Sequence, residues 1–307
     1  MNLLKKKTRK IRDFVSYDIW TLDLEELSKA KARFIKYIKV LFITIRTFSN
    51  EKIGFQAVAL SFFSTMSVVP FIAVAFTVSG GLGLADRLKQ LLYQYFENSQ
   101  QTIDTILGFA DNIIQTSQNG PVGLVSGIVF LSVIIWMMMS VERVFNNVWK
   151  VQKSRNIFKR LSFYIAILIL APFVVMTFFS GSLIYSRLLS FIGFDFVGFS
   201  TIKTILSWLL FTVLASLTFS AMYKFIPNAE VRYKNALLAS FFSGTAFTVM
   251  QYLYLETQLF VTRLNAIYGA FAAIPLFMVW INIGWFIILI GAQLSYAFQH
   301  VDNYNIE

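Results

Sequence analysis

The sequence contains no cysteine and a single histidine, and both scarcities limit the chemistry open to it. Without cysteine it has no disulfide, thiolate metal site or cysteine nucleophile. Hydrolysis of phosphodiesters usually needs clustered carboxylates for metals, or a histidine acting as acid or base. His300 lies beyond the last apolar stretch, acidic residues are sparse, and no glycine-rich phosphate loop is apparent. We therefore expect no enzymatic activity, catalytic residue, metal or cofactor.

Charged residues are scarce as well. They make up 14% of the 307 residues, whereas soluble domains average about 25%. The chain is 57% hydrophobic, and phenylalanine alone occurs 33 times. A soluble fold of this size could not bury so much apolar surface, and the exposed patches would aggregate. The composition therefore predicts a membrane protein.

The apolar residues fall into long runs. A membrane-spanning helix needs about 20 predominantly apolar residues, and six stretches of the sequence meet this requirement. We therefore predict an all-α, polytopic protein with a basic N-terminal segment 1–56, a six-span membrane domain 57–298 and a short tail 299–307. The predicted transmembrane helices are Ala57–Leu84, Val122–Val141, Leu161–Leu183, Ile202–Tyr223, Ala236–Leu259 and Ala272–Phe298.

The basic residues are distributed unevenly between the two sides of these spans. Of the 27 Lys and Arg residues, 22 fall on the side of the N-terminal segment and 5 on the opposite side. By the positive-inside rule, this asymmetry predicts six spans with both termini in the cytoplasm. The net charge of +11 is concentrated before Ala57, where 13 of the basic residues lie. That placement favours anionic lipid headgroups as partners, and not nucleic acid.

Two regions outside the spans have helical periodicity. In segment 1–56, apolar residues including Phe34, Ile38, Leu41 and Ile45 recur among basic ones. This pattern predicts an amphipathic helix that either lies on the inner membrane surface or packs on the spans as a cap. Residues 86–120 carry two apolar stripes, and we expect two amphipathic helices there on the outward side.

A few polar residues lie within or at the ends of the spans, where such residues often mark function. Glu142 and Asn146 share one helical face at the inner end of the second span, and Arg143 and Asn147 share the neighbouring face. They fit an interfacial salt bridge or helix anchor, or a polar constriction of a path. Gln251 and Asn282 lie deeper, at depths that differ by about 5 Å. A direct hydrogen bond between them would hold two helices together, and the alternative is that they line a path.

Prolines recur inside the predicted spans, among them Pro70 and Pro275. Each removes a backbone hydrogen bond, and we expect a kink in its helix. Ser61 and Ser64 lie in the turns before Pro70, where serine hydroxyls are able to satisfy a freed carbonyl. The kinks indicate either irregular packing or a broken helix that lines a path.

Four motifs occur in an order and spacing that resemble the YihY/BrkB family of membrane proteins. They cover about residues 50–298. The motifs are Ala57–Ser64 leading to Val69-Pro70; Val141–Trp149; Tyr223–Asn228, which includes Pro227; and Ile267-Tyr268-Gly269-Ala270 followed by Ile274-Pro275, Trp280 and Gly291-Ala292.

This resemblance implies a six-span protein of the bacterial cytoplasmic (inner) membrane. Members of the family carry a virulence-factor label and an older ribonuclease label, and lipid or solute export has also been proposed. The catalytic groups of a ribonuclease are missing here, so we expect no intrinsic ribonuclease activity. The family often has an acid where this chain has Gln293, which argues against a mechanism needing a carboxylate there, such as proton coupling.

Two functions remain open from the sequence. The first is a translocator or exporter of an unknown lipid or small solute, without its own ATPase because no ATP-binding motif is present. The second is a non-transporting structural or assembly protein of the cell envelope. The sequence leaves homo-oligomerisation open in both cases.

Overall fold

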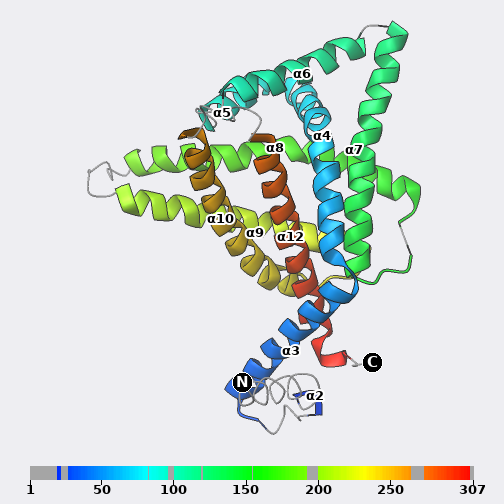
Figure 1. Ribbon diagram of the computed structural model, residues 1–307, viewed down its shortest axis with the longest axis vertical. Helices are drawn as coiled ribbons and strands as arrows, with labels where there is room; N and C mark the ends of the chain where they lie inside the picture. Colours follow the sequence, from blue (N-terminus) through cyan, green and yellow to red (C-terminus); the bar gives the residue numbers. More distant parts are fainter. Residues whose placement is uncertain are drawn as a thin grey trace.

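The computed structural model describes residues 19–21, 27–81, 83–95, 100–118, 120–153, 155–191, 200–263 and 273–304. Within these ranges the regular structure is entirely helical (Figure 1). The helices are α2 (Ile19–Thr21), α3 (Lys29–Asn50), α4 (Ile53–Gly81), α5 (Ala85–Tyr95), α6 (Gln100–Gln118), α7 (Gly120–Val148), α8 (Ile157–Phe191), α9 (Ser200–Phe225), α10 (Tyr233–Arg263), α12 (Ala273–His300) and η5 (Val301–Asn303).

Among the described residues, five helices are long and apolar enough to cross a membrane. They agree with five of the six predicted spans to within a few residues at most ends. The sixth, 161–183, lies in α8, whose side chains are only partly described. The five candidate spans are Ile53–Gly80, Gly127–Val148, Thr204–Phe225, Tyr233–Thr257 and Pro275–His300.

The outer surface of these helices is apolar. Ile128 and Trp136 of α7, Leu209 of α9 and Leu253 of α10 each expose more than half of their side-chain surface. Exposed apolar area on this scale would make a water-soluble protein aggregate, whereas lipid chains cover it without penalty. The structure therefore supports the predicted class of membrane protein.

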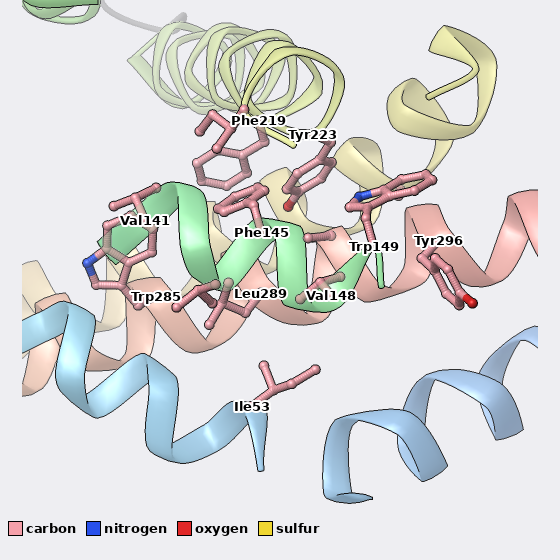
Figure 2. Packing of buried hydrophobic residues seen from close by; sticks show 14 of the residues in the cluster. Ile53, Val141, Phe145, Val148, Trp149, Phe219, Tyr223, Trp285, Leu289 and Tyr296 are labelled. Atoms are coloured by element: carbon pink, nitrogen blue, oxygen red, sulfur yellow. The ribbon is translucent and has the colours of Figure 1, made fainter. Parts of the chain in front are cut away.

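The core lies where α4, α7, α9, α10 and α12 meet, toward the end of the bundle that carries the C-terminus (Figures 1 and 2). Phe145, Tyr223 and Leu289 are fully buried there. Gly291 of α12 permits this close packing, because a Cβ at that position would lie 2.1 Å from the Tyr223 hydroxyl. The α7–α8 and α9–α10 connections and the C-terminus lie at this end of the bundle. We call it the basic end, because these connections carry Lys and Arg residues.

Helix α3 packs against the last turns of α12. Val40 and Ile43 are buried with Ala297 and Val301, and Lys36 forms an ion pair with Asp302 at 2.8 Å. A second apolar stripe on α3 remains exposed, formed by Phe34, Tyr37, Leu41 and Ile45. The helix therefore caps the spans with one face and leaves another apolar face uncovered.

Helices α5 and α6 occupy the opposite end of the bundle (Figure 1). Leu88 of α5 and Ile103 and Leu107 of α6 are buried against Phe76 of α4. These short helices therefore form a packed layer across the end of α4.

Candidate functional site

The most buried acidic group described is Glu142, near the end of α7, with 2% of its surface exposed. The Tyr164 hydroxyl of α8 donates a hydrogen bond of 2.6 Å to Glu142 Oε2. Arg160 Nε lies 3.2 Å from the same oxygen, as an ion pair without hydrogen-bond geometry. Glu142 Oε1 has no hydrogen-bond partner among the described residues. Buried charges need such partners, so this network ties α7 to the start of α8.

The other predicted polar residues of α7 point in different directions. Arg143 is exposed and does not pair with Glu142, whose ion-pair partner is Arg160 instead. Asn146 Oδ1 accepts a hydrogen bond of 2.8 Å from the backbone N–H of Asn228. Asn147 is partly buried, and its carbonyl helps to close the end of the helix. The predicted faces of α7 therefore exist, but only Glu142 and Asn146 contact another element through their polar groups.

A defined turn ends α7. Val151 N–H bonds to the Asn146 carbonyl at 2.9 Å, and Lys150 N–H bonds to the Asn147 carbonyl at 3.0 Å. Lys150 has a φ of 52°, so this is a Schellman motif with lysine in the position usually taken by glycine. Trp149 is buried, and its ring meets the Tyr296 ring edge-on at 5.6 Å. The turn directs the α7–α8 connection toward the α9–α10 connection.

Arg155 joins these two connections. Its Nη2 donates to the Phe225 carbonyl at 2.6 Å and to the Pro227 carbonyl at 3.2 Å. Its guanidinium lies 4.5 Å from the centroid of the Phe163 ring, while Asn228 Nδ2 donates to the Lys153 carbonyl at 2.9 Å. The motif that contains Pro227 is thus held by the α7–α8 connection.

The far side of the α9–α10 connection is bound to α12 and to itself. Gln299 accepts from the backbone N–H of Arg232 at 2.8 Å and donates to the Glu230 carbonyl at 2.9 Å. Lys224 Nζ donates to the Val231 carbonyl. The residues joined by these bonds surround a cavity of about 880 Å³ that is open to the outside at the basic end. It is lined by Arg155, Lys224, Phe225, Pro227, Asn228, Ala229, Glu230, Val231, Arg232 and Gln299.

The deeper polar residues form contacts between helices. Trp280 Nε1 donates to Gln251 Oε1 at 2.9 Å and thereby joins α12 to α10. Asn282 Nδ2 donates to Ser61 Oγ at 3.4 Å, and Trp285 Nε1 donates to Ser64 Oγ at 2.8 Å. The expected direct bond between Gln251 and Asn282 was wrong, because each amide has another partner. Trp280 and Asn282 are two residues apart on a helix and so point to nearly opposite sides.

The remaining predicted motif residues have separate environments. Pro70 lies inside α4, but the hydroxyls of Ser61 and Ser67 bond to the carbonyls of Val58 and Phe63, and not to the carbonyl that Pro70 frees. Pro275 lies in α12, two residues after the described part of this helix begins.

Gln293 is fully buried, and neither of its amide atoms has a hydrogen-bond partner among the described residues. Its side chain lies in the interior of the bundle, with no exposed surface. Tyr268 and Gly269 lie outside the described residues.

The cavity itself was not predicted from the sequence. In the sequence, Arg155, Lys224 and Arg232 contribute only to the charge asymmetry between the two sides of the spans. The spacing of Arg160 and Tyr164, four residues apart on one helical face, was the available signal for their shared contact with Glu142. Nothing in the spacing alone shows that two separate connections fold against each other.

A family profile and several individual relatives match this chain. The profile of the family described as virulence factor BrkB matches residues 44–307. A UPF0761 membrane protein of Acinetobacter baylyi is 30% identical over 84% of this chain and 61% of its own length. One from Janthinobacterium is 27% identical, covering 82% of this chain and 58% of its own length. One from Haemophilus influenzae is 24% identical, covering 83% and 93%.

The chain thus spans about three fifths of the length of the first two of these relatives. No solved structure matches it.

Proposed function

The chain belongs to the virulence factor BrkB family of membrane proteins, and we propose that it is a translocator or exporter of a lipid or small solute. It would lie in the bacterial inner membrane with six spans and with its basic end in the cytoplasm. The proposed translocator has no ATPase of its own, so transport would be facilitated, secondary or driven by a partner.

One observation carries this proposal. The open cavity at the basic end lies between the ends of two candidate spans and is lined by charged and polar side chains. Ligand sites are concave and have a few placed polar groups. Asn228, which lines the cavity, donates its backbone N–H to Asn146 of α7, the helix that also carries the buried Glu142. Ionisable groups inside membrane proteins are costly and commonly belong to functional sites.

The interhelical polar contacts deeper in the bundle fit a closed layer. Trp280–Gln251, Asn282–Ser61 and Trp285–Ser64 bonds join α12 to α10 and α4. In a translocator these contacts would separate to let a substrate pass from the cavity. The exposed stripe of α3 and its basic residues would lie on anionic headgroups of the inner leaflet.

Reconstitution tests the proposal. The full chain in proteoliposomes is assayed for flipping of fluorescent phospholipids and for uptake of a panel of small solutes. We expect at least one substrate to cross faster than in empty liposomes, and we expect Glu142→Gln to slow it. A folded protein that moves nothing above the empty-liposome rate would contradict transport and favour the envelope-assembly function.

A further inference from the structure

The charge that lines the cavity indicates the chemistry of its ligand. Arg155, Lys224 and Arg232 contribute three positive charges, and Glu230 contributes one negative charge. A cleft with a surplus of one sign of charge concentrates ions of the opposite sign. Its volume of about 880 Å³ falls within the range of about 300–1,000 Å³ typical of small-molecule sites. The cavity is therefore suited to an anion larger than a simple halide.

Two of the three cations, Arg155 and Lys224, are held in position by side-chain hydrogen bonds before any ligand arrives. Arg155 is fixed by two backbone carbonyls and by the ring of Phe163, and its Nη1 is buried without a hydrogen-bond partner among the described residues. Lys224 uses one N–H on the Val231 carbonyl, which leaves two further donors on the ammonium group. The backbone of Arg232 is fixed by Gln299, while its side chain is exposed. A planar guanidinium and a nearby ammonium suit the several oxygens of a phosphate group.

The position of the cavity adds a second argument. Lys224 and Phe225 end one candidate span, and Tyr233 begins the next. The cavity thus lies at the level where apolar helix surface gives way to polar connection, which is the level of lipid headgroups. Phe225 lines it and is 56% exposed, and Tyr233 beside it is 46% exposed. These rings offer an apolar surface next to the cations.

We propose that this cavity binds a phosphate group, carried by an anionic lipid headgroup or as free phosphate. The proposal rests on the proposed transport function and names the substrate class. The cations contact phosphate oxygens, and the apolar rim contacts the first carbons of an attached chain.

Binding to the purified full chain in detergent tests this assignment, with native mass spectrometry as the readout. The probes are dihexanoylphosphatidic acid, inorganic phosphate, and dihexanoylglycerol, which lacks the phosphate. The double variant Lys224→Gln/Arg232→Gln is compared with Lys234→Gln, an exposed cation in the first turn of α10 that does not line the cavity. The single variant Arg232→Gln serves if the double variant does not fold.

We expect dihexanoylphosphatidic acid to bind and the double variant to weaken it by about tenfold or more, because each lost cation removes charge-assisted hydrogen bonds. Lys234→Gln should bind as the unmodified chain does, and dihexanoylglycerol should not bind. If the variants weaken the binding of inorganic phosphate as much as that of the lipid, the site recognises phosphate itself. Binding of the lipid alone would assign it to a headgroup.

Unchanged lipid and phosphate binding in the double and single variants would overturn the assignment. So would a failure of both phosphate probes to bind the unmodified chain. Transport that persists without this binding would contradict the phosphate site but leave the proposed transport function in place. Binding without any transport would support the phosphate site and contradict the proposed transport function.

Discussion

The Tyr164 hydroxyl of α8 donates a hydrogen bond to the buried carboxylate of Glu142 on α7, over 2.6 Å. Arg160, one turn earlier on α8, supplies the positive charge at 3.2 Å. One oxygen thus receives both partners, and the other has none among the described residues. This arrangement joins the end of α7 to the beginning of α8.

Tyr164→Phe should lower the stability of the protein by about 1–2 kcal/mol, because the variant loses a hydrogen bond to a charged group. Glu142→Gln keeps an acceptor for Tyr164 but leaves Arg160 without its ion pair, so we expect a larger loss, up to about 3 kcal/mol. Thermal unfolding in detergent micelles measures both. Ser162→Ala is the control, because Ser162 bonds only within its own helix. An equal, small effect of all three substitutions would show that the network contributes no stability.

Gly291→Ala should prevent normal packing of α12. A Cβ there would lie 2.1 Å from the Tyr223 hydroxyl and 2.6 Å from Ser243 Oγ, and overpacking of a core typically costs about 1–3 kcal/mol or more. Gly284→Ala on the same helix is the matched control, because its Cβ would meet nothing closer than 3.5 Å. It should be neutral or stabilising by up to about 1 kcal/mol, since alanine is the better helix former.

The two glycine variants are compared by their unfolding temperatures in one detergent. Adding Tyr223→Phe to Gly291→Ala removes the nearest clashing atom and should restore part of the loss. If Gly291→Ala and Gly284→Ala unfold at the same temperature, the close approach of α9 and α12 is wrong.

The Trp280–Gln251 bond should contribute to the association of helices. Gln251→Leu and Trp280→Phe are each expected to destabilise, with a coupling energy of about 0.6 kcal/mol in a double-mutant cycle, the average for such bonds in a membrane. Transport measured in proteoliposomes by the Gln251→Leu variant separates the two roles. Retained transport with reduced stability assigns Gln251 to helix packing, while lost transport in a stable protein assigns it to the path.

Burial lowers the pKa of Lys39 from its usual 10.5, although Asp302 raises it in part. The ammonium form is therefore disfavoured in the folded protein, and its cost in stability is greatest at pH values below the folded pKa. The cost declines as pH rises from the folded pKa toward 10.5. Lys39→Met should accordingly raise the unfolding temperature at neutral pH, and this advantage should shrink as the pH approaches 10.5. An advantage independent of pH would point to packing alone.

The sequence predicted the helices well because their signal is local. Lengths of apolar sequence placed five candidate spans near their observed positions. Side-chain partners were less predictable, because they depend on the rotation of one helix against another. Gln251 and Asn282 were compared by depth, whereas direction determines that Asn282 contacts Ser61.

The cavity could not be predicted from the sequence for a related reason. It forms where Arg155, far along the chain, bonds to the carbonyls of Phe225 and Pro227. The basic residues of these connections gave a topological signal only, and their convergence follows from tertiary packing. Glu142 stands out in the sequence because acids are rare near the spans, whereas its partners on α8 follow from how the two helices pack.

Labelling of single cysteines tests the central claim most directly, since the natural chain has no cysteine that would need removal. Ala229→Cys places a thiol in the cavity, and Asn112→Cys places one on the exposed surface of α6 at the opposite end. A membrane-impermeant maleimide should label Ala229→Cys only in inverted vesicles and Asn112→Cys only in right-side-out vesicles. Labelling of Ala229→Cys from outside would contradict a cytoplasmic cavity at the basic end.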